Sequence, residues 1–232
     1  MMNGLKLPEG IRRKMGDLHA QAEDIGRSGA QVVRAEEMFL KIDAEGKLAR
    51  AAAMQEYFAK KRLSAPLIAY EQSGGRDFLL VRAVPGEYAC SGEMLREPQK
   101  LAALLGETMR MLHETDAADC PLCDANERAE AMYEAEHDGR AHEGAGLLRK
   151  EALVHGDHCL PNVFFENGRF SGYIDLGDAG IGDRHLDICC ALWSLGYNTK
   201  SERWRGTLLD AYGREAVDAQ RLALCMQLYG YE

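Results

Sequence analysis

The stretch ALVHGDHCLPNVFF, residues 152–165, sets polar side chains between two apolar runs. The runs around Leu153 and Phe164 are rich in the aliphatic and aromatic residues typical of buried strands. Asp157 and Asn162 therefore stand where the pattern around them predicts buried structure. Either they are turn residues between two strands, or the fold holds them in place for chemistry.

Composition limits the classes of protein to which the chain can belong. Its 232 residues are 46% hydrophobic, enough for one large domain or two lobes. A net charge of -9 disfavours nucleic acid or an anionic membrane as a partner and is compatible with a cationic small substrate. No apolar run approaches the roughly 18 residues of a membrane span. Seven scattered cysteines, Cys120 and Cys123 among them, predict reduced thiols in the cytoplasm rather than a disulfide framework or a zinc site.

The first part of the chain predicts a small α+β unit. It contains a glycine-bearing turn followed by segments that alternate between strand formers and helix formers. In chain order these are the turn Gly26–Gly29, a hairpin over Gln31–Arg34 and Met38–Ile42, a helix within 45–62 and a strand pair over 65–72 and 77–84.

From Ser91 onward the pattern favours helices. The Asn167-Gly168 pair is a strong hairpin signal and predicts a turn after Phe165. The expected helices cover Pro98–His113, Ala125–Glu136 and three segments from about Arg184, with breaks near Asn198 and Gly213. We place the boundary at Pro85, which gives two lobes, 1–84 and 85–232.

The motifs meet the requirements for phosphoryl transfer from ATP. That reaction needs a loop over the phosphates, a cation beside them, a carboxylate for the acceptor and oxygen ligands for magnesium. The chain offers the turn Gly26–Gly29, Lys41 on the second strand, Asp157, and then Asn162 and Asp175. His-Gly-Asp, an Asn five residues later and an Asp thirteen residues after that form a far more specific pattern than a glycine turn or a lysine alone.

The segment HGDHCLPNVFFENGRFSGYIDLGDAGIGDRHLDI resembles the catalytic and metal-binding signature of aminoglycoside phosphotransferase-like kinases, particularly the 3′-phosphotransferase branch. GRSGAQVV, MFLKI and the DCP at 119–121 are similar to that family too, so the resemblance covers nearly the whole chain. It implies an α+β, two-lobed protein-kinase-like fold. A small antiparallel sheet lobe with one helix and a larger, mainly helical lobe would hold the nucleotide in the cleft between them.

The resemblance also implies an activity and a set of site residues. The expected reaction uses Mg²⁺ and transfers the γ-phosphate of ATP or GTP to a substrate hydroxyl. The favoured acceptor is the 3′-hydroxyl of an aminoglycoside. Asp157 would be the catalytic base, and Asn162 and Asp175 the metal ligands. The expected nucleotide-binding residues are Ser28 and Gly29 in the loop, Phe39 on adenine, Lys41 on the α- and β-phosphates, and the backbone of Arg82 and Val84 at the hinge.

On the substrate side we expect Asp157 and four further acidic residues, Asp178, Glu127, Glu130 and Glu232. A solvated charged face explains the two glutamates on the 125–136 helix equally well. Lys41 could instead be a solubilising strand residue, and Phe39 a core residue. His155 is expected to support its loop by hydrogen bonding, and Asp183 and Asp187 to serve as helix cap and loop anchor.

Three departures from the family leave alternatives open. Ala51 stands where a glutamate usually orients the lysine, and Asp178 replaces an arginine and adds a carboxylate near Asp175. Only 31 residues separate Cys123 from His155, which shortens the substrate lobe. The alternatives are a kinase for another amino alcohol or sugar, and a weakly active or inactive nucleotide-binding protein.

Overall fold

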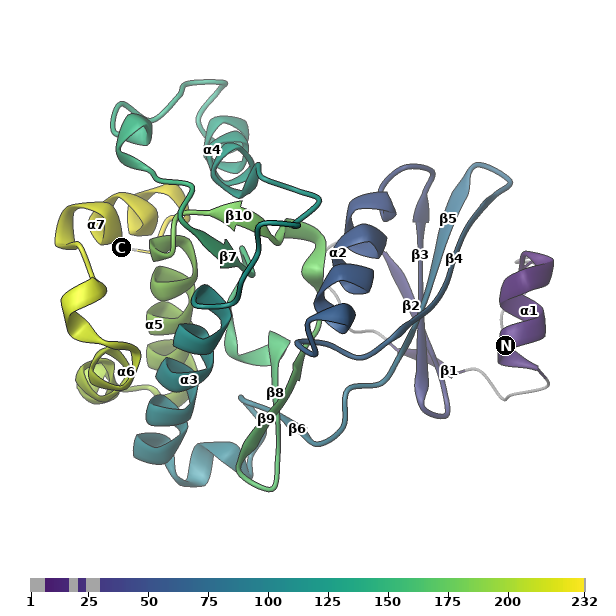
Figure 1. Cartoon of the computed structure of the whole chain (residues 1–232), viewed down its shortest axis with the longest axis horizontal. Coiled ribbons are helices and arrows are strands. Elements are labelled where there is room, and N and C mark those ends of the chain that lie inside the picture. Colours follow the sequence, from purple (N-terminus) through teal and green to yellow (C-terminus); the bar gives the residue numbers. More distant parts are fainter. Residues whose placement is uncertain (1–6, 17–20, 24–29, 232) are drawn as a thin grey trace. The chain divides into compact units, whose positions relative to one another are not determined.

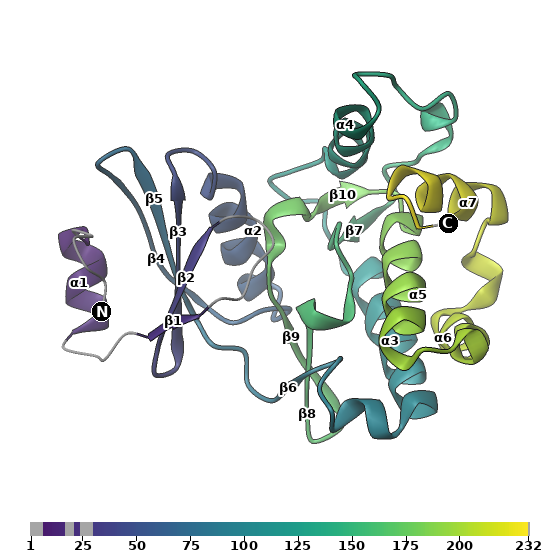
Figure 2. The same cartoon turned by 180° about the vertical axis from the view of Figure 1, so that it is seen from behind.

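The structure is a computed structural model that describes residues 7–16, 21–23 and 30–231. Ser28, Gly29 and Glu232, which we expect at the site, lie outside this range. The chain divides into two compact units, Met1–Val84 and Pro85–Glu232. Figure 1 and Figure 2 show their elements from opposite sides. Across the described ranges, no helix combines the length and apolar character needed to cross a membrane.

The first unit is a five-stranded antiparallel sheet with a helix packed on each face. Its strand order is β1-β2-β3-β5-β4. The strands are β1 (Gln21–Glu23), β2 (Gln31–Ala35), β3 (Met38–Ala44), β4 (Leu67–Ser73) and β5 (Arg76–Arg82), and the helices are α1 (Glu9–Met15) and α2 (Ala49–Lys60). The two predicted strand pairs and the helix between them are confirmed. Helix α1 was not predicted, so the described part of this unit contains two helices where one was expected.

Alternation along β3 determines which helix each of its side chains faces. Leu40 and Ile42 are buried with Ile11 of α1. Since successive strand residues point to opposite faces, Phe39 and Lys41 lie on the other face, where Leu79 packs against α2.

The second unit is built around a buried helix, α5 (His185–Thr199). The other helices are α3 (Pro98–His113), α4 (Ala125–Glu136), α6 (Arg205–Tyr212) and α7 (Ala219–Leu228). Strand β7 (Ala152–Val154) pairs with β10 (Gly180–Gly182), and β8 (Val163–Glu166) pairs with β6 (Glu87–Tyr88) and β9 (Arg169–Tyr173). The predicted helices Pro98–His113 and Ala125–Glu136 are confirmed to the residue, as is the hairpin turn at Asn167-Gly168.

Helices α3 and α6 cross at Gly106, where a side chain has no room. A Cβ atom there would lie 2.3 Å from the Leu208 carbonyl oxygen and 2.9 Å from Ala211 Cβ. Real Cβ atoms do not approach backbone this closely, so any larger residue must push the helices apart.

We therefore predict that Gly106→Ala lowers the free energy of unfolding by about 1–3 kcal/mol through overpacking. The sign is informative, because alanine is the better helix former by roughly 1 kcal/mol. Urea unfolding followed by circular dichroism measures the change. Gly206→Ala in α6 is the matched control, since its Cβ meets Arg214 Nη2 at an ordinary 3.7 Å. Stabilisation by Gly106→Ala would contradict the close crossing.

Candidate active site

The turn after β7 carries His155, Gly156 and Asp157 and depends on the glycine. Gly156 has φ +80°, a conformation that strains other residues. A Cβ atom at Gly156 would also lie 2.4 Å from the carbonyl oxygen of Asp178. The glycine therefore lets the Asp157 turn press against the 3₁₀ turn Leu176–Asp178, which follows Asp175.

Asp187, in the first helical turn of α5, anchors the loop turn that carries Asp157. Its side chain is fully buried, and its two oxygens accept the backbone N–H groups of His155 and Gly156, both at 2.8 Å. His113 Nε2 lies 3.1 Å from Oδ2, while His113 Nδ1 lies 2.8 Å from the Tyr212 hydroxyl. Burial alone would raise the pKa of Asp187, but the hydrogen bond from His113 and the nearby imidazoles lower it to about 2. The expected loop anchor is confirmed.

His155 supports the same turn with both ring nitrogens. Nε2 donates to the Ile174 carbonyl at 2.8 Å, because a carbonyl can only accept. Nδ1 is then the acceptor for the Asp157 backbone N–H at 3.2 Å. Both nitrogens are occupied, so His155 supports the loop, as expected, and ties the Asp157 turn to the end of β9.

Asn162 holds the Asp157 carboxylate directly. Its Nδ2 group donates to the Asp157 carbonyl and to Asp157 Oδ2, both at 2.9 Å. With both amide hydrogens used, the Oδ1 atom of Asn162 is its remaining polar group, and it can only accept or bind a cation. The Ile174 N–H donates to the Asn162 carbonyl at 3.0 Å, which brings Asp175, the next residue, into the same loop cluster.

Asp175 has an unusual backbone conformation. It lies two residues beyond the end of β9, with φ +60° and ψ +59°, the left-handed region that non-glycine residues seldom adopt. Its side chain is exposed. The structure therefore brings Asp157, Asn162 and Asp175 onto adjoining loops, with the first two in direct contact.

In the first unit, Lys41 and Phe39 lie on the α2 face of the sheet. Lys41 pairs in register with Leu79, which packs against Ala51, so Ala51 lies on the same face as Lys41. Phe39 is half-buried, and the Arg34 guanidinium lies 5.7 Å from its ring centroid.

The end of β5 offers a backbone carbonyl at Arg82. The Arg82 N–H donates to the Pro66 carbonyl at 3.1 Å. Pro66 cannot return a hydrogen bond to Arg82, because proline has no N–H. Buried Val84 follows at the end of this unit. A proline therefore stands opposite the position where the resemblance places a nucleotide-binding backbone group.

The acidic residues expected on the substrate side have different surroundings. Asp178 forms an ion pair with Arg128 of α4, whose Nε lies 2.9 Å from Oδ1. Glu127 pairs with Lys150. Glu130 is half-buried, and burial followed by the charges of Glu127 and Glu134 raises its pKa. Sequence reasoning missed Arg128, which supplies a cation at Asp178 and offsets the repulsion expected between Asp178 and Asp175.

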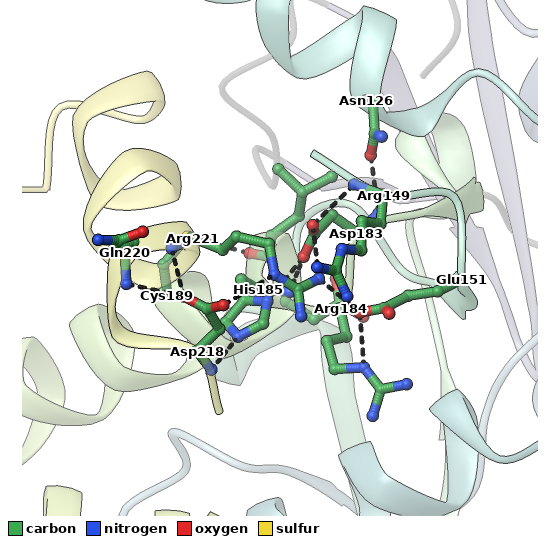
Figure 3. A network of polar contacts seen from close by, with 12 residues as sticks. Asn126, Arg149, Glu151, Asp183, Arg184, His185, Cys189, Asp218, Gln220 and Arg221 are labelled. Atoms are coloured by element: carbon green, nitrogen blue, oxygen red, sulfur yellow. Dashed lines mark hydrogen bonds and ion pairs between the residues drawn. The ribbon is translucent and has the colours of Figure 1, made fainter. Parts of the chain in front are cut away.

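A second buried acid, Asp183, joins the start of α5 to three other segments (Figure 3). It accepts the Arg149 N–H at 2.9 Å, His185 Nδ1 at 2.7 Å and Arg221 Nη1 at 3.0 Å. Its own N–H donates to Asn126 Oδ1 at 2.7 Å. Burial would raise the pKa of Asp183, but these donors, led by His185, lower it to about 2. Every contact is internal, so Asp183 is structural, consistent with its expected role at the helix start.

Comparison with known proteins identifies relatives along nearly the whole chain. The profile of the phosphotransferase enzyme family matches residues 24–225. A probable aminoglycoside 3′-phosphotransferase of Lactococcus lactis is 35% identical over 252 aligned positions, which cover 97% of this chain and 95% of that protein.

Solved structures show the same fold. The crystal structure of an aminoglycoside-3′-phosphotransferase of type VIII superposes with a TM-score of 0.73 at 22% identity and covers 96% of both chains. A Streptomyces rimosus aminoglycoside phosphotransferase in complex with ADP and streptomycin gives 0.72 at 19% identity, also over 96% of both chains. The predicted protein-kinase-like fold is confirmed.

We predict that Asp187→Asn lowers the free energy of unfolding at neutral pH by about 3 kcal/mol, because it removes a buried charge from its donors. The folded pKa of Asp187, about 2, lies below its unfolded value near 4. Its stabilisation is therefore complete above pH ~4 and is lost as the pH falls towards 2.

Urea unfolding at a series of pH values measures this difference between parent and variant. It should shrink steadily as the pH falls. Asp210→Asn, which removes an exposed charge paired with Arg214, is the control and should change stability little. A difference that stays constant at every pH would contradict the anchoring role of the Asp187 charge.

Proposed function

We propose that this chain, which belongs to the phosphotransferase enzyme family, transfers the γ-phosphate of ATP to the 3′-hydroxyl of an aminoglycoside, an antibiotic-resistance activity. The proposal rests mainly on the way the Asp157 carboxylate is held. Asp157 stands on a turn held by Asp187, and Asn162 fixes one of its carboxylate oxygens at 2.9 Å. The choice of an aminoglycoside as the acceptor is supported by family membership and by the similarity to the probable aminoglycoside 3′-phosphotransferase of Lactococcus lactis.

Asp157 is the base that we assign to the acceptor hydroxyl. Because Asn162 engages Oδ2, we assign Oδ1 to orient the hydroxyl and take its proton as the phosphoryl group is transferred. The side chain is only partly buried, so a substrate can reach it. The glycine and the buried anchor fix the direction of the carboxylate before a substrate binds, which lowers the entropic cost of reaction.

Asn162 and Asp175 are the ligands that we assign to magnesium. The donor set fits this ion, since the amide hydrogens of Asn162 are used on Asp157 and its oxygen remains for a cation. Asp175 adds a carboxylate from the adjoining loop. When bound, the ion neutralises charge on the phosphates.

The first unit, residues 1–84, is the part to which we assign nucleotide binding. Lys41 would neutralise the α- and β-phosphates, and Phe39 would stack on the base of ATP or GTP. Pro66 has no N–H to donate to the Arg82 carbonyl. This carbonyl and the backbone of Val84 would bind the edge of the base. Residues 85–232 would supply catalysis and the acceptor site.

The acidic α4 helix supports a cationic acceptor. The raised pKa of Glu130 reports burial among like charges, and a bound ammonium group would relieve that repulsion. Glu127 and Asp178 already have cationic partners in Lys150 and Arg128, so their contact with substrate requires these pairs to open.

ADP release measured over a panel of aminoglycosides tests the proposed activity. The sharpest pair consists of one aminoglycoside and its analogue lacking only the 3′-hydroxyl, each with Mg²⁺ and either ATP or GTP. We expect ADP release with the first and a rate near background with the second. Equal rates for the pair would overturn the 3′ assignment, and release with a simple amino alcohol alone would favour a different acceptor class.

Asp157→Asn should lower kcat by at least about 10²-fold, because the base and its orienting charge are lost. Nucleotide affinity should stay at the parent value, since Asp157 faces the acceptor. Coupled ADP-release kinetics and calorimetric titration with a non-hydrolysable ATP analogue measure the two effects. A variant that keeps half the parent rate would contradict the assignment.

Asn162→Ala and Asp175→Ala should each weaken Mg²⁺-dependent nucleotide binding by about tenfold or more, because each variant loses one oxygen ligand of the Mg²⁺ ion, a hard cation that prefers oxygen. Titrations with and without Mg²⁺ separate this loss from a change in the nucleotide contacts. Glu166→Ala, at the exposed end of β8, is the control. Parent-like Mg²⁺ dependence in both variants would rule out these ligands.

A further inference from the structure

Two thiols lie beside the Asp157 carboxylate. Cys159 Sγ, Cys190 Sγ and an Asp157 carboxylate oxygen all lie within 4.8 Å of one another. Cys159 is on the Asp157 loop, whereas Cys190 comes from α5 and is fully buried. The proposed phosphoryl transfer uses neither thiol.

A hydrogen bond ties the Cys159 loop to α5, the helix that carries Cys190. The Leu160 N–H, directly after Cys159, donates to the Ser194 hydroxyl at 3.0 Å. Ser194 is one helical turn beyond Cys190 in α5. Cys190 is packed in a core cluster with Leu186 and Cys225, and Cys159 borders that cluster.

The donor set is suited to a soft metal ion rather than to magnesium. Zinc binds thiolate sulfur at about 2.3 Å and carboxylate oxygen at about 2.0–2.2 Å, so ligand atoms on one ion stand roughly 3.5–4 Å apart. Small side-chain rotations would bring these three atoms to that spacing. Three protein ligands and a water complete a tetrahedral site, while magnesium prefers six oxygens.

We propose that Cys159, Cys190 and Asp157 form a binding site for a soft divalent cation such as Zn²⁺ or Cd²⁺, and that its occupation inhibits the enzyme. Each thiol gives up its proton to solvent as its sulfur binds the ion, and no oxidant is needed. The bound ion occupies the Asp157 carboxylate and so prevents it from accepting the proton of the acceptor hydroxyl. Inhibition rests on the proposed function, whereas metal binding does not.

Cadmium titration tests the binding, followed by the ultraviolet charge-transfer band of cadmium thiolates. Cys123 is exposed and Cys120 is half-buried, and this pair could also bind cadmium, so the background protein carries Cys120→Ser and Cys123→Ser. We expect one Cd²⁺ per chain and loss of the band in Cys159→Ala and Cys190→Ala. Cys225→Ala, which removes a buried thiol outside the set, is the matched control and should keep the band.

A band of parent strength in Cys159→Ala overturns the site. Cys159 is partly exposed, so this variant decides the question even where Cys190→Ala fails to fold. Asp157→Asn should bind Cd²⁺ about tenfold more weakly, as the loss of a metal contact commonly does.

Zinc inhibition of phosphoryl transfer tests the consequence. Half-inhibition of Cys159→Ala should require at least about tenfold more Zn²⁺ than the background protein, each compared with its own zinc-free rate. Equal sensitivity overturns the inhibitory role. A cadmium band that needs Cys159 in a chain inactive on aminoglycosides would uphold the metal site and reject the proposed activity.

Discussion

A carboxylate that is buried away from solvent stays ionised only when hydrogen-bond donors surround it. Asp187 accepts hydrogen bonds from His113 and from the backbone N–H groups of His155 and Gly156. This interaction joins distant segments of the second unit. Through His113 it reaches α3 and, by way of Tyr212, α6, while its two backbone bonds fix the turn that carries Asp157. The position of the proposed base therefore depends on packing far from it along the chain.

Burial separates the structural acids from those available for chemistry. Asp183 and Asp187 are both fully buried, surrounded by donors and held ionised with pKa values of about 2. Asp157 and Asp175 lie on loops and reach solvent. All four are aspartates of one short stretch, so their environments rather than their residue type decide their roles.

Local signals in the sequence predict most of the fold and the members of the site, but not the contacts between distant segments. Helical periodicity predicts α3, a polar helix-forming segment predicts α4, and Asn167-Gly168 predicts the hairpin. The seven residues of α1 are too few for a periodic pattern. Arg128 is fifty residues from Asp178, and no local pattern indicates that they pair. The partners of Asp183 in α4 and α7 depend likewise on tertiary packing.

Amide hydrogen exchange at His155 and Gly156 tests the central claim most directly. If the Asp187 carboxylate holds the turn, these two amides should exchange only through global unfolding, as slowly as those of the buried strand β7. In Asp187→Asn they should exchange much faster than β7, by local opening of the turn. Fast exchange of both amides in the parent chain would contradict the account, because the turn that carries Asp157 would then open without the anchor being broken.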